Sequence, residues 1–222
     1  MKILFGCVKA KFKTLKMLYK KGGVKLILRH FLRKYVFIPL EKKTSLLSFL
    51  YFIILDKPLL ISQKMEEFSA FISFLKEKNV RNVLEIGTYK GGSAFLFHKL
   101  LNANVTTIDI KQILLVRIAL MLKGIRVIQG NSHDEKVLEK VKRSYDLLFI
   151  DGDHDYNGVK KDFEMYSHLV REGGIIAFHD IFSERGVNIF WNEIKRNYDY
   201  VEIKDKVEPY GIGVLIKKGK KL

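Results

Sequence analysis

The chain has 222 residues, with 40 Lys and Arg against 24 Asp and Glu and a formal net charge of +16. This length supports one α/β domain with an extension. The only cysteine, Cys7, excludes an internal disulfide framework and a Cys-rich zinc site, which favours a reducing, cytoplasmic setting.

The positive charge is concentrated at the N-terminus, where residues 1–43 hold 13 Lys and Arg against one acid, Glu41. Between Val8 and Tyr19, apolar residues recur at helical spacing beside a stripe of lysines, which predicts an amphipathic basic helix. A second basic, apolar-rich stretch covers residues 24–38. We therefore divide the chain into a basic amphipathic helical extension, residues 1–60, and a folded domain, residues 61–222.

The basic extension has several interpretations that the sequence leaves open. Its charge attracts phosphate, which a membrane surface, a nucleic acid or an anionic glycan could supply. Apolar side chains beside lysines suit an interfacial anchor on an anionic membrane through residues 1–43, and helices that cap the domain or pair subunits suit the pattern equally well. Nucleic acid is the less favoured partner. The expected location is cytoplasmic, with peripheral attachment to the inner membrane face as the open alternative.

The N-terminal sequence matches neither a secretory signal nor a membrane span. Lysines interrupt its apolar residues, unlike the uninterrupted core of a signal peptide. The longest apolar run, residues 46–55, is about half the length that a bilayer crossing needs. No transmembrane helix is predicted.

From about residue 66 the pattern changes to alternating helices and short apolar strands, which is typical of a parallel sheet. Helices are expected over residues 67–78, 92–101, 112–122, 135–143, 158–170 and 186–196. Strands are expected over residues 82–86, 104–110, 126–129, 146–150, 174–179, 198–204 and 211–216, with the last two as an antiparallel hairpin. The predicted fold class is α/β, a Rossmann-like, seven-stranded, mostly parallel sheet with helices on both faces.

Polar or glycine-rich residues follow the predicted strands directly. In open parallel sheets, ligands bind beyond the carboxyl ends of the strands. The glycine turn after Glu85 leads into a helix whose first N–H groups are free, and Asp109 at the end of the next strand can accept hydrogen bonds from ribose hydroxyls. These features predict a nucleoside-binding crevice. The spacing of Gly87, Gly91 and Gly92 does not match the dinucleotide pattern, which disfavours NAD.

Two segments carry a resemblance to a known family. Residues 83–93 read VLEIGTYKGGS, and this run resembles the first motif of class I S-adenosylmethionine-dependent methyltransferases, especially catechol O-methyltransferase-like and sugar O-methyltransferases. Residues 149–156, FIDGDHDY, and 173–180, GGIIAFHD, are similar to the downstream motifs of that branch. The resemblance covers roughly residues 66–216.

The resemblance implies S-adenosyl-L-methionine as cofactor. It implies that the methionine end is surrounded by Glu85, Gly87, Tyr89, Gly91 and Ser93, that Asp109 holds the ribose, that Ser132 lies beside the adenine, and that Asp151 belongs to the same site. In metal-dependent members the acids that match Asp151 and Asp180 bind Mg²⁺, which prefers such oxygen ligands. That branch often has Asn after the second acid, where this chain has Ile181, so the need for metal stays open.

The chemistry expected of this site is in-line transfer of an activated methyl group to an acceptor oxygen. A metal would lower the pKa of the acceptor hydroxyl, and without one His154 or His179 could act as general base. Each histidine also has a structural interpretation, His154 as an anchor of its loop and His179 as a partner of Asp180.

The leading functional hypothesis is O-methylation of a hydroxylated small molecule, sugar or glycan. The alternatives are a membrane-attached binding or scaffold protein with this fold and a nucleic-acid methyltransferase. The sequence does not identify the acceptor or the oligomeric state.

Overall fold

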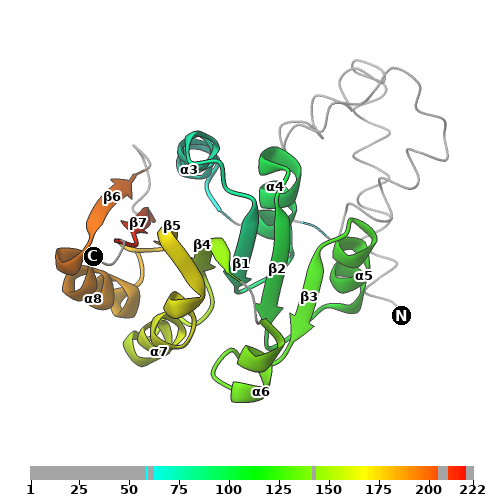
Figure 1. Cartoon of the computed structure of the whole chain (residues 1–222). Coiled ribbons are helices and arrows are strands. Elements are labelled where there is room, and N and C mark those ends of the chain that lie inside the picture. The colour runs from blue at the N-terminus through cyan, green and yellow to red at the C-terminus, as the bar shows by residue number, and fades with distance from the viewer. Residues whose placement is uncertain (1–58, 60–62, 142–143, 205–209, 219–222) are drawn as a thin grey trace, which may run out of the picture. The chain divides into compact units, whose positions relative to one another are not determined.

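The computed structural model describes residues 59, 63–141, 144–204 and 210–218 (Figure 1). Except for Leu59, the predicted basic extension, residues 1–60, lies outside this part of the chain. The described residues all belong to one compact unit, residues 50–222. None of the helices in the described ranges is long and apolar enough to cross a bilayer.

Seven strands alternate with helices along the chain. The α-helices are α3 (Met65–Glu77), α4 (Gly92–Leu101), α5 (Leu114–Leu122), α6 (Glu135–Leu138), α7 (Tyr156–Tyr166) and α8 (Arg185–Ile194). Short 3₁₀ turns extend α6, α7 and α8; these are η2 (Glu139–Val141), η3 (Ser167–Leu169) and η4 (Lys195–Asn197). The strands are β1 (Asn82–Ile86), β2 (Asn104–Asp109), β3 (Arg126–Gln129), β4 (Tyr145–Ile150), β5 (Val170–Phe178), β6 (Asp199–Ile203) and β7 (Ile212–Ile216).

The strands form a single sheet in the order β3-β2-β1-β4-β5-β7-β6. The first five pair in parallel, whereas β7 lies antiparallel to both β5 and β6. The order reverses direction between β1 and β4, which is where open α/β sheets bind ligands. The predicted Rossmann-like fold, including the antiparallel final pair, is confirmed.

Helices cover both faces of the sheet because the strand residues alternate between two hydrophobic cores. Figure 1 shows α3, α4 and α5 on one face and α6, α7 and α8 on the other. On the first face the rings of Phe68, Phe71, Phe97 and Phe149 pack together, with centroid separations from 5.3 to 6.3 Å. Since Phe149 is on β4, this cluster fixes α3 and α4 against the strand that leads into the site.

Two predicted boundaries differ from the structure for identifiable reasons. Strand β5 begins at Val170 rather than at the predicted Gly174, because Val170 pairs with Tyr145 of β4. The register between the two strands shifts after this pair, and the Gly173–Gly174 step accommodates the shift. The helix predicted over residues 135–143 ends as an α-helix at Leu138 and continues as a 3₁₀ turn to Val141. The remaining elements match within a few residues.

Candidate active site

A cavity of about 640 Å³ opens beyond the carboxyl ends of β1 to β5. It is lined by residues that follow these strands and by a short stretch before α3. The lining residues are Gln63, Lys64, Ile86, Gly87, Thr88, Tyr89, Lys90, Gly92, Ser93, Ile108, Asp109, Ile110, Gly130, Asn131, Ser132, His133, Asp151, Gly152, Asp153, His154, His179, Asp180 and Tyr210.

The loop after β1 is held close to both neighbouring strands. Gly87 has φ +95°, and a Cβ there would lie 1.9 Å from the carbonyl oxygen of Asp151, so only glycine fits. Tyr89 has φ +43°, and its N–H donates to Asp109 Oδ2 at 2.7 Å. Asp109 Oδ1 accepts from the N–H of Lys111 at 2.8 Å. Two backbone donors therefore hold the Asp109 carboxylate at the cavity wall, and its remaining lone pairs are available to hydroxyl donors.

The N-terminus of α4 faces this cavity. Gly92 and Ser93, its first two residues, line the cavity wall, and the residue before them, Gly91, provides no side-chain cap. Uncapped N–H groups at a helix start favour an anionic ligand group. Gly91 itself does not line the cavity, because its Cα faces the side chains of Leu59, Val116 and Leu120.

Glu85 lies beneath the cavity floor and is not exposed to solvent. Its Oε2 accepts from the Thr107 hydroxyl at 2.5 Å, while Oε1 has no hydrogen-bond partner of its own in the described residues. Burial raises the pKa of Glu85 to about 8, although the hydroxyls of Ser93 and Thr107 oppose the shift. At neutral pH the carboxyl of Glu85 is therefore mostly protonated, unlike that of an exposed glutamate.

A second buried acid supports the loop after β3. Asp162 on α7 is fully buried, and its Oδ1 lies 3.2 Å from Nε2 of His133. Burial raises the pKa of Asp162, and the nearby Ser132 side chain and His133 ring oppose this shift. The Tyr166 hydroxyl donates to the carbonyl oxygen of Ser132 at 2.7 Å, which fixes that residue at the cavity edge.

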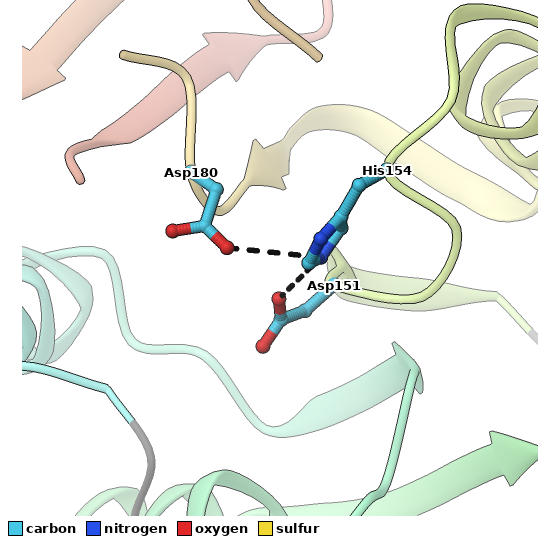
Figure 2. Close-up of side chains that lie close together, drawn as sticks. All are labelled: Asp151, His154 and Asp180. Carbon is cyan, nitrogen blue, oxygen red and sulfur yellow. Dashed lines mark ion pairs between the residues drawn. The ribbon is translucent and has the colours of Figure 1, made fainter. Parts of the chain in front are cut away.

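Asp151, His154 and Asp180 converge at the other end of the cavity (Figure 2). Nε2 of His154 lies 3.7 Å from Asp151 Oδ1 and 3.7 Å from Asp180 Oδ2, and the ring points between the two carboxylates. The nearby carboxylate of Asp151 raises the pKa of His154. Asp180 adopts φ +60°, an unusual conformation for a non-glycine residue and one found more often at functional sites.

His179 connects this acidic pair to α3. Its Nδ1 lies 3.2 Å from both Asp151 Oδ1 and Asp180 Oδ2, and Nε2 lies 2.9 Å from Oε1 of the fully buried Glu67. Burial opposes the protonated form, but the charge of Asp151, the close Asp180 carboxylate and the hydrogen bond with Glu67 hold the pKa of His179 well above its ordinary value. Glu67 also accepts from the N–H of Gly211 at 2.8 Å. His179 is therefore a buried cation enclosed by three carboxyl groups.

The same contacts shift the pKa of Asp151 in the opposite direction, below its ordinary value. Burial would raise the pKa of its carboxyl, but the positive charge of His179, the nearby His154 ring and the hydrogen bond from Gln63 lower it well below the ordinary range. Nε2 of Gln63 donates to Asp151 Oδ2 at 2.9 Å. Asp151 consequently stays ionised at neutral pH although it is largely enclosed.

Most residues that the sequence predicts for the site come together in the structure. Of the predicted cofactor residues, Gly87, Tyr89, Ser93, Asp109, Ser132 and Asp151 line the cavity, as do His154, His179 and Asp180. Glu85 and Gly91 support the lining from behind. Sequence reasoning missed Gln63, Glu67, His133 and Asp162. Glu67 left a signal, since it stands among Phe68, Phe71 and Leu75 on the apolar side of a predicted helix, where an unpaired carboxylate is costly.

The donor set at Asp151, His154 and Asp180 fits a divalent cation. One ligand atom from each residue lies within 4.8 Å of the others, and both carboxylates are oriented toward a common point. Two carboxylate oxygens and an imidazole leave positions open for substrate, an arrangement that Mg²⁺ or Mn²⁺ accepts.

Comparison with known proteins agrees with this geometry. Residues 84–181 match a family described as a methyltransferase domain. An uncharacterised protein of Acanthamoeba polyphaga mimivirus is 32% identical over 117 residues, which are 47% of this chain and 53% of that protein. The chain thus spans about half the length of this curated relative.

The fold of this chain is also similar to those of solved methyltransferase structures. An O-methyltransferase from Bacillus cereus, in complex with S-adenosylhomocysteine, superposes with a TM-score of 0.58 at 19% identity, covering 85% of this chain and 96% of that one. The MycE methyltransferase of mycinamycin biosynthesis, in complex with Mg, S-adenosylhomocysteine and mycinamycin VI, gives a TM-score of 0.51 at 18% identity, covering 68% and 49%. The fold of class I S-adenosylmethionine-dependent methyltransferases is thereby confirmed, and residues 84–181 are similar to a methyltransferase domain.

Proposed function

We propose that this protein is an S-adenosylmethionine-dependent O-methyltransferase that acts on a hydroxylated small molecule, sugar or glycan. The observation that carries the proposal is the position of Asp151, His154 and Asp180, which converge in the same cavity as the Asp109 carboxylate. One end of the cavity suits a nucleoside, and the other suits a reacting hydroxyl.

The cofactor would extend along the ends of β1, β2 and β3. Asp109 would accept hydrogen bonds from the ribose hydroxyls, since two backbone N–H groups already orient its carboxylate. The uncapped start of α4 would bind the methionine carboxylate through Gly92 and Ser93. Ser132, held by Tyr166, would lie beside the adenine.

The acidic end of the cavity would hold a divalent metal through Asp151, Asp180 and His154. When bound, such an ion lowers the pKa of an acceptor hydroxyl and orients it for attack on the methyl group. MycE, which shares the fold, was solved in complex with Mg, S-adenosylhomocysteine and mycinamycin VI. The acids suit this role because Asp151 remains ionised at neutral pH.

The two histidines would have different tasks. His154 is 39% exposed and borders the cavity, so it can reach an acceptor and take up its proton when no metal occupies the site. His179 is buried and already protonated against Glu67, Asp151 and Asp180, so it would position the two aspartates rather than act as a base.

The basic N-terminal residues bear on the identity of the acceptor. A glycan or lipid-linked sugar would suit a cytoplasmic enzyme that attaches peripherally to an anionic membrane through basic residues 1–43. Those residues lie outside the described part of the chain, and their role rests on their sequence alone.

Calorimetric titration of the full chain with S-adenosylmethionine and with S-adenosylhomocysteine tests the cofactor. Both should bind in the micromolar range, whereas ATP, an anionic adenine nucleotide without a methionine end, should bind more weakly. Failure of the folded protein to bind either compound would contradict the proposal and favour a scaffold role.

A further titration tests the metal. Mn²⁺ added to the complex with S-adenosylhomocysteine should bind at one site, and Mg²⁺ should displace it. Cofactor binding without any Mn²⁺ binding would leave His154 as the proton acceptor.

A further inference from the structure

Exposed apolar side chains of the described residues are concentrated in one short segment. Twelve large hydrophobic side chains in these ranges are exposed, and seven of them fall between residues 110 and 122. We name this group the α5 face, and it consists of Ile110, Ile113, Leu114, Leu115, Ile118, Met121 and Leu122, with exposed fractions from 40% to 67%. A cluster of this kind on a soluble domain marks an interaction surface.

The helix that carries most of this face is apolar on two sides. Val116, Ala119 and Leu120 are buried against the sheet. On the outer side, Leu114, Leu115, Ile118, Met121 and Leu122 recur at the spacing of one helical face. A helix that is hydrophobic around most of its circumference is normally buried on both sides, but the described residues bury only one side of α5.

The charged residues within the segment that carries the α5 face are all basic. Residues 110–133 contain Lys111, Arg117, Lys123 and Arg126 and no acidic residue. Lys111 and Arg126 are exposed, and the other two are partly buried. Apolar side chains edged by cations are the pattern of a surface that enters the head-group region of an anionic bilayer.

The α5 face adjoins the mouth of the cavity. Ile110 belongs to the face and also lines the cavity, next to Tyr89 and Lys90 of the loop after β1. That loop packs on α5, since Gly91 faces Val116 and Leu120. Figure 1 shows α5 beside β3, at the end of the sheet away from β6.

We propose that the α5 face binds the surface of an anionic lipid bilayer, with its Leu, Ile and Met side chains at the acyl boundary and Lys111 and Arg126 at the head groups. Charge selects the bilayer over two other occupants. A second copy joined through this face would bring like charges together, and the basic part of the N-terminal extension, residues 1–43, has the same sign. The contact is independent of methyl transfer, although it would bring the cavity mouth to the bilayer if the proposed function holds.

Vesicle co-sedimentation of the full chain tests this contact without cofactor or acceptor. The test variant is the double substitution Leu115→Gln and Leu122→Gln, which leaves the net charge and the site residues unchanged. The matched control is Ile189→Gln with Val201→Gln, two exposed apolar positions on α8 and β6. Vesicles contain equal parts of phosphatidylcholine and phosphatidylglycerol.

The α5 variant should bind these vesicles at least about tenfold more weakly than wild type, because two exposed leucines lose their burial in lipid. The control should bind like wild type, and all three proteins should melt at the same temperature. Equal binding of wild type and the α5 variant, or no binding by wild type, would overturn the proposal.

Two further results would also overturn the bilayer proposal, because each would identify a different occupant of the α5 face. A lower melting temperature for the α5 variant alone would mean that another part of this chain covers the face. If wild type is a dimer in sedimentation velocity, the α5 variant is a monomer, and both bind vesicles equally, the α5 face would be assigned to a second copy. The cofactor titration with wild type is unaffected by any of these outcomes, so the two proposals fail separately.

Discussion

The two ends of the cavity are built in different ways. At the ends of β1 and β2, the backbone N–H groups of Tyr89 and Lys111 hold a single carboxylate, Asp109, which is partly exposed. At the ends of β4 and β5, Asp151 and Asp180 enclose His179, and the whole group is largely buried. The first end can bind a neutral nucleoside with little rearrangement. The second holds concentrated charge in fixed positions, which is the requirement of a reacting centre.

The largest expected effect comes from Asp180→Asn. Asparagine tolerates the positive φ of this position, so the variant should fold while losing a metal-binding charge. Its affinity for Mn²⁺ in the presence of S-adenosylhomocysteine should fall by about a hundredfold, as measured by electron paramagnetic resonance. Its affinity for S-adenosylhomocysteine alone should match wild type. Loss of both affinities would mean that the two ends of the cavity are not separate.

Asp109→Asn is the matched change at the other end. Removing the charge that faces the ribose should weaken S-adenosylhomocysteine between about tenfold and a hundredfold, because charge-assisted hydrogen bonds are lost. Calorimetry gives this affinity, and Mn²⁺ binding under saturating cofactor should be unchanged. Equal effects of Asp109→Asn and Asp180→Asn on cofactor binding would show that their roles are misassigned.

Glu67→Gln should affect the acidic end alone, and less strongly. The change leaves His179 with one fewer carboxylate and should lower the free energy of unfolding by about 2 kcal/mol, as measured in urea. The pKa of His179 should also fall, since the lost charge favoured its protonated form. Glu66→Gln, at an exposed neighbour on α3, is the control and should change neither quantity. Cofactor affinity should be the same in both variants.

The sequence predicts the acids at the strand ends of the cavity, but it does not predict the long-range contacts that hold them. Asp109, Asp151 and Asp180 were identifiable because each follows an apolar strand, and parallel strands place their carboxyl ends at one edge. The contact of His179 with Glu67 was not identifiable, because the two residues stand 112 positions apart and meet only when α3 packs on the sheet. The order β3-β2-β1-β4-β5 follows from the fold class, whereas the start of β5 depends on pairing with Tyr145 that no local pattern encodes.

Glu85→Gln should have the smallest effect on either ligand, because Glu85 lies beneath the floor rather than in the lining. Its effect should appear in the pH dependence of stability. Burial raises the pKa of Glu85 from 4.5 to about 8 in the folded protein, so the folded state binds this proton more tightly than the unfolded state. The resulting stability is fully present below about pH 4.5 and is lost as the pH rises through about 8.

Glutamine stays neutral, so the variant should lack this loss. Urea unfolding of the ligand-free protein between pH 5 and pH 9 should therefore show the wild type losing stability relative to Glu85→Gln as the pH rises. Parallel curves would mean that Glu85 is ionised in the folded protein and already has a donor for Oε1. The buried acid beneath the nucleoside end would then resemble Asp151 at the other end, and the contrast between a protonated buried acid at one end and an ionised one at the other would be lost.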